Sequence, residues 1–327
     1  MNIRRRTLLQ AMAALPAAGF ALPAHATAWP ERTMKFINPF AAGGATDTLS
    51  RIYAEAASRA FGVQMLVDNR TGAGGTIGLA AVAKSAPDGY TVGMMTNGTH
   101  IFAKALLPQM PYDTETEFTY IAGLWDMPNI LVVHPSVPAQ SIPELIELLK
   151  NNPGKYSFAS AGVGTSTHIA AELFRQTAGV KMVHIPYRGG APANLDLLAG
   201  VVHMYFDNIT GSMGNIAAGK VKALGVTSPQ RSPALPDVPA IAEFLPGFQL
   251  TSWTGVVGPA GIAPNIAGKI EQATFKILSD PDVAQKFAKL GAVPYTAKGD
   301  ELKKRMQEEE KNLLPKVSQM GLRIEGK

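Results

Sequence analysis

The stretch NPFAAGGATDTLSR, residues 38–51, places the glycine pair Gly43 and Gly44 between two segments of different character. MKFIN at 34–38 reads as a buried strand, and residues 47–60 repeat apolar side chains at helical spacing. Glycine and small polar residues between two such segments are typical of a turn from a strand into a helix. The stretch therefore predicts one strand–loop–helix unit, and it raises the question of what the loop holds.

The same unit recurs along the chain. Further strands are expected at 63–69 and 91–95, with a helix from about 76 to 84 between them. The alternation restarts after about residue 131, with expected strands in YSFAS, VHIPY, VVHMYFDN and VKALGVT. Strands that alternate with helices at this spacing form parallel sheets with right-handed crossovers, so the predicted fold class is α/β.

Two crossings of the chain predict two lobes. The chain leaves the first unit between about 125 and 131, and the strand-like run FQLTSWTGVVGPA carries it back before the C-terminal helices begin near residue 264. Each lobe is expected to be a mainly parallel sheet flanked by helices, with a two-segment hinge and a cleft between the lobes. The expected boundaries are 29–127 plus 253–327 for lobe 1 and 128–252 for lobe 2.

The N-terminal residues 1–28 read as an export signal. A basic segment, NIRRRTLLQ, precedes a short apolar run, and A-x-A patterns at 24–26 and 26–28 predict cleavage near residue 26 or 28. RRTLL at 5–9 also resembles a twin-arginine signal. The alternative is an uncleaved membrane anchor, but the apolar run is shorter than the roughly 20 residues that a bilayer needs.

Composition excludes several classes of protein. The chain has no cysteine, which rules out disulfides, a lipid-modified cysteine anchor, thiol catalysis and cysteine-ligated metal. Three of its basic residues lie in the export signal, and the remainder carries a formal charge of only +2, which argues weakly for a nucleic-acid surface. We therefore expect a soluble protein of the bacterial periplasm that does not bind nucleic acid.

Glycines and small polar residues repeatedly follow the expected strand ends. In open parallel sheets, ligands bind at the carboxyl ends of strands, where helices begin with unpaired N–H groups that favour anions. Six such loops, distributed over both lobes, predict a lined cleft that holds an anion; they fall at 42–47, 71–76, 96–99, 160–167, 188–190 and 207–212.

Nucleotide, hydrolase and metal motifs fail on spacing. In GAGGTIG, Ile77 stands where the dinucleotide motif needs glycine, and Lys84 lacks the glycine of a phosphate-binding loop. There is no G-x-S-x-G elbow, so 165–167 are expected to cap the helix that carries His168 and to donate to a ligand rather than to catalyse. The histidines show no zinc-binding spacing. No catalytic residue, metal or cofactor is predicted.

Several polar and aromatic residues keep more than one interpretation. Asp47 either supports the start of its helix or contacts a ligand ammonium, hydroxyl or bound water. Arg188 either clamps a carboxylate, pairs with an acid such as Asp207, or lies on the surface. Four aromatic residues supply either a wall of the site or core: Phe40, Trp125, Tyr187 and Trp253.

Seven segments in their order resemble one family: NPFAAGGATD, VDNRTGAGGTIG, SAPDGYTV, SAGVGTSTH, HIPYRGGAPANLDLLAG, SPQRSPALPDVPAIAE and WTGVVGPAGIAP. Together they resemble the substrate-binding receptors of tripartite tricarboxylate transporters, also called Bug receptors, from about residue 29 to the C-terminal helices. The resemblance implies a two-lobed periplasmic binding protein, type II-like, that closes over a small organic anion. It also implies delivery of that anion to a membrane complex with a large and a small subunit.

The resemblance also implies a set of site residues. The pocket loops are 39–47, 69–76 and 160–168, together with the acid Asp207, and one ligand carboxylate is held by backbone N–H groups and bridging waters rather than by arginine. The expected ligand-binding residues are Phe40, Gly44, Ala45, Thr46, Asp47, Gly75, Thr76, Thr96, Asn97, Ser160, Gly164, Thr165, Ser166, His168 and Asp207.

The function expected from both arguments is capture of a small organic acid, without catalysis. The ligand is a mono- or dicarboxylate, an aromatic acid or an acidic amino acid. The alternative is an exported two-lobed α/β enzyme that acts on a small organic acid, with turnover that depends on Asp47, His168 or Asp207. The sequence leaves open which acid is bound and which membrane complex receives it.

Overall fold

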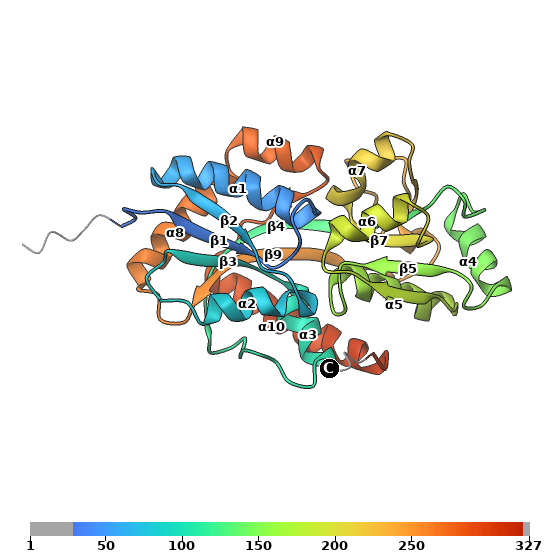
Figure 1. Ribbon diagram of the computed structural model, residues 1–327, viewed down its shortest axis with the longest axis horizontal. Helices are drawn as coiled ribbons and strands as arrows, with labels where there is room; N and C mark the ends of the chain where they lie inside the picture. The colour runs from blue at the N-terminus through green and yellow to red at the C-terminus, as the bar shows by residue number, and fades with distance from the viewer. Residues whose placement is uncertain (1–28, 323–327) are drawn as a thin grey trace, which may run out of the picture.

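The computed structural model describes residues 29–322, and the expected export signal lies outside them. The molecule is elongated, and one ten-stranded sheet runs through both of its halves (Figure 1). Helices α1, α6, α7 and α9 lie along one side of this sheet in the view, and α2, α5 and α10 lie along the other.

The first half contains the three parallel strands that the sequence predicts, in the order β2-β1-β3. Helix α1 ends at Gly62, whose left-handed backbone (φ 69°) closes the helix as a C-terminal glycine commonly does. The elements are β1 (Met34–Asn38), α1 (Ala45–Phe61), β2 (Met65–Asn69), η1 (Ala73–Gly75), α2 (Thr76–Ala83) and β3 (Thr91–Thr96).

The second half repeats this arrangement, with three parallel strands in the order β6-β5-β7. Its helices α5, α6 and α7 each follow one of these strands, as predicted from the alternation of the sequence. The elements are α4 (Ile142–Asn151), β5 (Ser157–Ser160), α5 (Ser166–Ala178), β6 (Val183–Pro186), α6 (Gly190–Leu198), β7 (Met204–Asn208) and α7 (Ile209–Ala217).

One long strand joins the halves. β4 (Phe118–Val133) pairs antiparallel with β9 (Thr251–Pro259) up to Pro128, and with β7 and β8 (Lys222–Val226) from Asn129 onward. Proline has no N–H to donate to a ladder, so Pro128 fits the point at which β4 exchanges one set of partners for another. The predicted boundaries, 127/128 and 252/253, lie beside this point, and the division into lobes at those residues stays a prediction.

The structure adds features that the sequence pattern did not indicate. The strands at the junction are antiparallel, including β8, so only the outer three strands of each half form a parallel sheet. A π-helical turn, η2, follows β3 and leads into α3. The remaining elements are η2 (Gly98–Phe102), α3 (Ala103–Leu106), η3 (Ile241–Glu243), α8 (Pro264–Leu278), α9 (Pro281–Lys289), β10 (Val293–Pro294) and α10 (Gly299–Gln319).

Both tryptophans considered for a site wall belong to the core. Trp125 and Trp253 are fully buried; Trp125 packs edge-on against Phe287, with ring centroids 5.7 Å apart, and the Trp253 indole N–H donates to Glu309. Within the same described residues, no helix combines the length and the apolar character needed to cross a membrane.

Candidate functional site

The loops at the carboxyl ends of the parallel strands meet between the two halves and enclose a cavity of about 30 Å³. By the usual measure this is room for roughly two ordered waters, so the halves lie nearly closed on each other. Residues from both halves line the cavity: Phe40, Ala45, Thr46, Thr96, Asn97, Ala161, Thr165, Ser166, Gly190, Asp207, Asn208 and Ser252.

Four helices begin at this cavity. Helix α1 begins with lining residues Ala45 and Thr46. Helices α5 and α6 begin with lining residues Ser166 and Gly190, and α7 begins directly after Asn208. None of the four has a side-chain hydrogen bond at its N-cap. The first N–H groups of a helix lack intrahelical partners and carry the positive end of its dipole. The cavity therefore presents bare amides from both halves and favours an anion.

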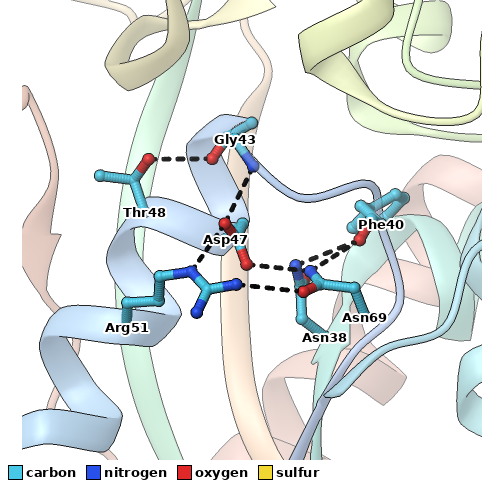
Figure 2. Close-up of polar contacts among 8 residues, drawn as sticks. Asn38, Phe40, Gly43, Asp47, Thr48, Arg51 and Asn69 are labelled. Carbon is cyan, nitrogen blue, oxygen red and sulfur yellow. Dashed lines mark hydrogen bonds and ion pairs between the residues drawn. The ribbon is translucent and has the colours of Figure 1, made fainter. Parts of the chain in front are cut away.

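Asp47 shapes the first loop (Figure 2). Its Oδ2 accepts hydrogen bonds from the Gly43 amide and from Arg51 Nε, both at 2.9 Å, and its Oδ1 accepts from Asn69 Nδ2 at 2.9 Å. Asn69 also donates to the Phe40 carbonyl at 3.0 Å. Gly43 has φ +79°, a conformation that favours glycine. Both oxygens of Asp47 thus hold the loop, as in the supporting interpretation of this residue, and Asp47 is not among the lining residues.

The electrostatics of Asp47 follow from these contacts. Burial works against ionisation, but the hydrogen bonds from Arg51, Gly43 and Asn69 outweigh it and hold the pKa of the carboxyl below its usual value. Asp47 is therefore ionised at neutral pH.

The loop between β3 and η2 is held by its own side chains. The Thr99 hydroxyl accepts from the Thr96 amide at 3.0 Å, and the Thr96 hydroxyl accepts from the Thr99 amide at 3.1 Å. Asn97 Nδ2 donates to the Thr251 carbonyl at 2.8 Å and so ties this loop to the start of β9. These bonds fix Thr96 and Asn97 where they line the cavity.

In the second half, the loop 160–168 is braced by a pair of histidines. His168 stacks on His184, with ring centroids 4.1 Å apart, and His168 Nδ1 accepts from the Gly164 amide at 3.2 Å. Ser160 Oγ lies 2.6 Å from His184 Nε2. Burial lowers the pKa of His168 to about 3 and that of His184 to about 4, so both rings are neutral. Ser160, Gly164 and His168 thus stabilise the loop 160–168 without lining the cavity.

Asp207 is an ionisable side chain that lines the cavity, and it is only 1% exposed. Its Oδ2 accepts hydrogen bonds from Asn194 Nδ2 and Ser212 Oγ, both at 2.8 Å. Burial raises the pKa of Asp207 to about 6, against the opposing effect of these hydrogen bonds. Among residues 29–322, no lysine, arginine or histidine lines this cavity.

A second, outer chamber of about 220 Å³ adjoins the cavity and shares Phe40 and Ala161 with it. Its walls are the glycine turn 72–75, the segment 161–163 and the segment 186–188. Arg188 is exposed here and makes no ion pair with Asp207, whose hydrogen-bond partners are neutral. Tyr187 donates its hydroxyl to Asp196 at 2.6 Å. Of the interpretations considered for Arg188, the pairing with Asp207 is absent.

The two halves touch through bare backbone. A Cβ atom at Gly74 would lie 2.4 Å from the Val163 carbonyl oxygen, and one at Gly98 would lie 3.0 Å from the Gly164 carbonyl oxygen. Gly44 likewise faces Ala191 across the seam, at 3.5 Å. Distances under 3.0 Å are essentially never seen for real Cβ atoms, so Gly74 lets the halves close; a Cβ at Gly98 would be tight, and one at Gly44 would be in ordinary contact.

The structure thus brings together eight of the fifteen expected ligand-binding residues as lining: Phe40, Ala45, Thr46, Thr96, Asn97, Thr165, Ser166 and Asp207. Gly75 lines the outer chamber, and the other six lie behind or beside the lining: Gly44, Asp47, Thr76, Ser160, Gly164 and His168. Contact of any of them with a ligand stays a prediction.

Four lining residues were missed as site residues: Ala161, Gly190, Asn208 and Ser252. The first three fall within the glycine-rich loops that the sequence marked, so those loops carried the signal. Ser252 lies in the junction strand β9, where nothing in the local pattern indicated a site. Within residues 29–322, no cluster of three or more His, Asp or Glu side chains is arranged to hold a metal ion.

Two lobes joined by crossing strands, with a closed cavity between helix N-termini, define the fold of a periplasmic binding protein. The tripartite tricarboxylate transporter family receptor, TctC, matches residues 49–322, and the chain belongs to this family. It is 39% identical over 292 residues to a Pseudomonas sp. protein of the tcbD-tcbE intergenic region, covering 89% of this chain and 87% of the relative. It is 35% identical to Protein BugT of Bordetella pertussis, covering 87% and 88% of the two chains.

Solved structures of the same fold include two with bound acids. Rpa4515 of R. palustris with adipate has a TM-score of 0.88 and 31% identity, covering 90% of this chain and all of the neighbour. MatC of Rhodopseudomonas palustris with bound malate has a TM-score of 0.84 and 32% identity, covering 88% of this chain and all of the neighbour. The family and these neighbours are solute-binding proteins.

Proposed function

We propose that the protein is an exported periplasmic receptor that captures a small organic carboxylate between its lobes and delivers it to a tripartite membrane transporter. One observation carries the proposal: four helix N-termini without side-chain caps, from both lobes, converge on one cavity. The bound adipate and malate of the two neighbours support an organic acid as the ligand. Export would remove residues 1–28, and the chain itself would perform no catalysis.

Capture depends on closure. A carboxylate that docks on the first amides of α1 is reached from the other lobe by Thr165, Ser166 and the start of α6. A ligand that touches both lobes binds the closed state better than the open one, and this difference in affinity drives closure. The nearly filled cavity fits this scheme, because the lobes must part before an acid of several heavy atoms can enter.

We expect a small organic acid to stabilise the protein against heat. A ligand present at a hundred times its dissociation constant adds about 2.7 kcal/mol to the free energy of unfolding, which is a rise of several degrees in melting temperature. The measurement is a thermal-shift screen of mono- and dicarboxylates, aromatic acids and acidic amino acids, with neutral sugars and cations as controls. Stabilisation by a sugar or a cation, and by no acid, would contradict the proposal. Mass spectrometry of the incubated acid tests the enzymatic alternative through the appearance of a product.

Replacing Gly44 with valine should weaken acid binding more than folding. Gly44 has φ −83°, which valine adopts without strain, so the open form should fold normally. The added Cβ, however, would lie 3.5 Å from the Ala191 amide nitrogen of the other lobe, and the valine methyl groups would reach further. We expect about a tenfold loss of affinity, from the 1–3 kcal/mol typical of overpacking. Titration calorimetry measures the loss of affinity, and thermal unfolding of the ligand-free protein measures the loss of stability. Equal losses of affinity and stability would mean that the loop has a structural role and no specific role in binding.

A further inference from the structure

Asp207 places a buried acid in the space that a ligand carboxylate must enter. The lining of the cavity supplies amides, amide side chains and hydroxyls, and among residues 29–322 no cation lines it. When the lobes are closed, water cannot screen two carboxylates from each other. Two carboxylates that share such a site do not both remain ionised, because the pKa of one of them rises strongly. One proton must therefore accompany the ligand.

The structure assigns that proton to Asp207: we propose that Asp207 takes up a proton when an organic acid binds and donates it as a hydrogen bond to a ligand carboxylate. This inference rests on the proposed function and identifies the polar contact at the second-lobe end of the site. The proton comes from solvent as the lobes close and returns to solvent on release, and no covalent bond changes.

The surroundings of Asp207 leave it as the group that titrates. On β7, the nearby titratable group is Tyr205, which is buried and whose pKa is raised well above its usual value, so it stays neutral. The contacts from α6 and α7 are the neutral Asn194 and Ser212, and β4 places Ile130 opposite Asp207. Among residues 29–322, the first lobe lines the cavity with Phe40, Ala45, Thr46, Thr96 and Asn97, none of which is titratable.

The other charged or titratable groups near the cavity do not line it. Asp47, next to lining residue Thr46, pairs with Arg51, and Arg188 is exposed in the outer chamber. His168 of α5 is stacked on His184 and neutral. With the lobes closed, burial raises the pKa of Asp207 to about 6 even without a second acid beside it. A second carboxylate in the same cavity raises the pKa of Asp207 further, because two like charges so close together disfavour ionisation.

The test is titration calorimetry of the full mature chain between pH 6 and 8, with a panel of mono- and dicarboxylates that includes malate and adipate. Each titration is repeated in buffers of different ionisation enthalpy, which reports the number of protons taken up. For the wild-type protein at pH 7.5 we expect uptake of about one proton per ligand, and a loss of affinity of about tenfold for each pH unit between 6.5 and 8.

The informative variant is Asp207→Asn, which imitates the protonated acid. Its amide oxygen can accept from Asn194 and Ser212, and its NH₂ group can donate into the cavity. We expect no proton uptake, affinity that no longer changes with pH, and tighter binding than wild type at pH 8. Asp282→Asn, on the exposed face of α9, is the matched control and should keep the wild-type profile.

Two results would overturn the inference while leaving the receptor function standing. One is acid binding with no proton uptake and flat affinity in the wild-type protein, a measurement that does not depend on the variant folding. The other is preferential binding of zwitterionic amino acids with loss of binding in Asp207→Asn, which would mean that Asp207 stays ionised and holds an ammonium. If no acid of the panel binds at any pH, the proposed function fails, and this inference fails with it.

Discussion

Replacing Gly98 with valine is expected to lower the affinity for the organic acid by about 100-fold, with little change in the stability of the ligand-free protein. Gly98 opens the π-helical turn after β3, and its backbone does not have positive φ, so valine meets no local conformational barrier. A Cβ atom there would lie 3.0 Å from the Gly164 carbonyl oxygen and 3.3 Å from Thr165 Cα, both in the second lobe, and 3.3 Å from Thr96 Oγ1 in its own lobe. The branches of valine would push these atoms away.

The physical reason is that the contacts with Gly164 and Thr165 exist only when the lobes are closed, whereas the side chain of Thr96 can move away in the open form. An overpacked contact costs about 1–3 kcal/mol, occasionally more, and most of this penalty falls on the closed state. The apparent affinity drops by the same factor as the population of the binding-competent state.

Three measurements check this prediction. Calorimetry gives the loss of affinity, small-angle scattering shows whether the acid still makes the protein more compact, and thermal unfolding without ligand reports folding. Gly268→Val is the matched control, since Gly268 lies within helix α8 and a Cβ there would meet nothing within 4 Å. Full affinity in Gly98→Val, or an equal loss of affinity in Gly268→Val, would show that the contact of Gly98 with the second lobe does not control binding.

The sequence predicted the outer parts of the fold better than its junction. Each outer strand is a short apolar run followed by a glycine loop and a helix, so local pattern alone defines β1, β5 and β7. The junction strand β4 was not predicted as one element, because the sequence indicated only that the chain leaves the first unit between about 125 and 131. Only the pairing in space shows that Phe118–Val133 form one strand of 16 residues that changes its partners. Antiparallel pairing of β8 and β9 is a long-range property that no local pattern contains.

The same distinction holds for the site. Loops with glycine and small polar residues were recognised, because helix starts and close approaches need those residue types. What each side chain does within a loop was harder to predict: Asp47 and His168 carry conspicuous chemistry, yet they brace the loops. The partner of His168 in this bracing is His184, which lies on another strand, β6, and therefore left no signal in the loop motif.

Replacing Asp47 with alanine is expected to remove both stability and binding. The substitution leaves the Gly43 amide and one Asn69 N–H without their acceptor, and it ends the ion pair with Arg51. Losing hydrogen bonds to a charged acceptor costs about 1.5–3 kcal/mol each, with partial compensation by water, so we expect a loss of about 2–4 kcal/mol in the free energy of unfolding. Affinity for the acid should fall at least tenfold, because the turn before α1 loses the contacts that fix it.

The pH dependence separates this effect from general damage. Since the folded-state pKa of Asp47 is lower than its ordinary value of 3.8, its stabilisation is fully present above that value and is lost as the pH falls through the folded-state pKa. Denaturant unfolding should therefore show a constant difference in the free energy of unfolding between wild type and Asp47→Ala from pH 5 to 8. This difference should become smaller below about pH 4. Arg51→Gln, which removes a half-exposed partner, is the control and should cost about 0.5 kcal/mol. If the difference in the free energy of unfolding stays the same in acid, the ionised carboxylate does not hold the loop.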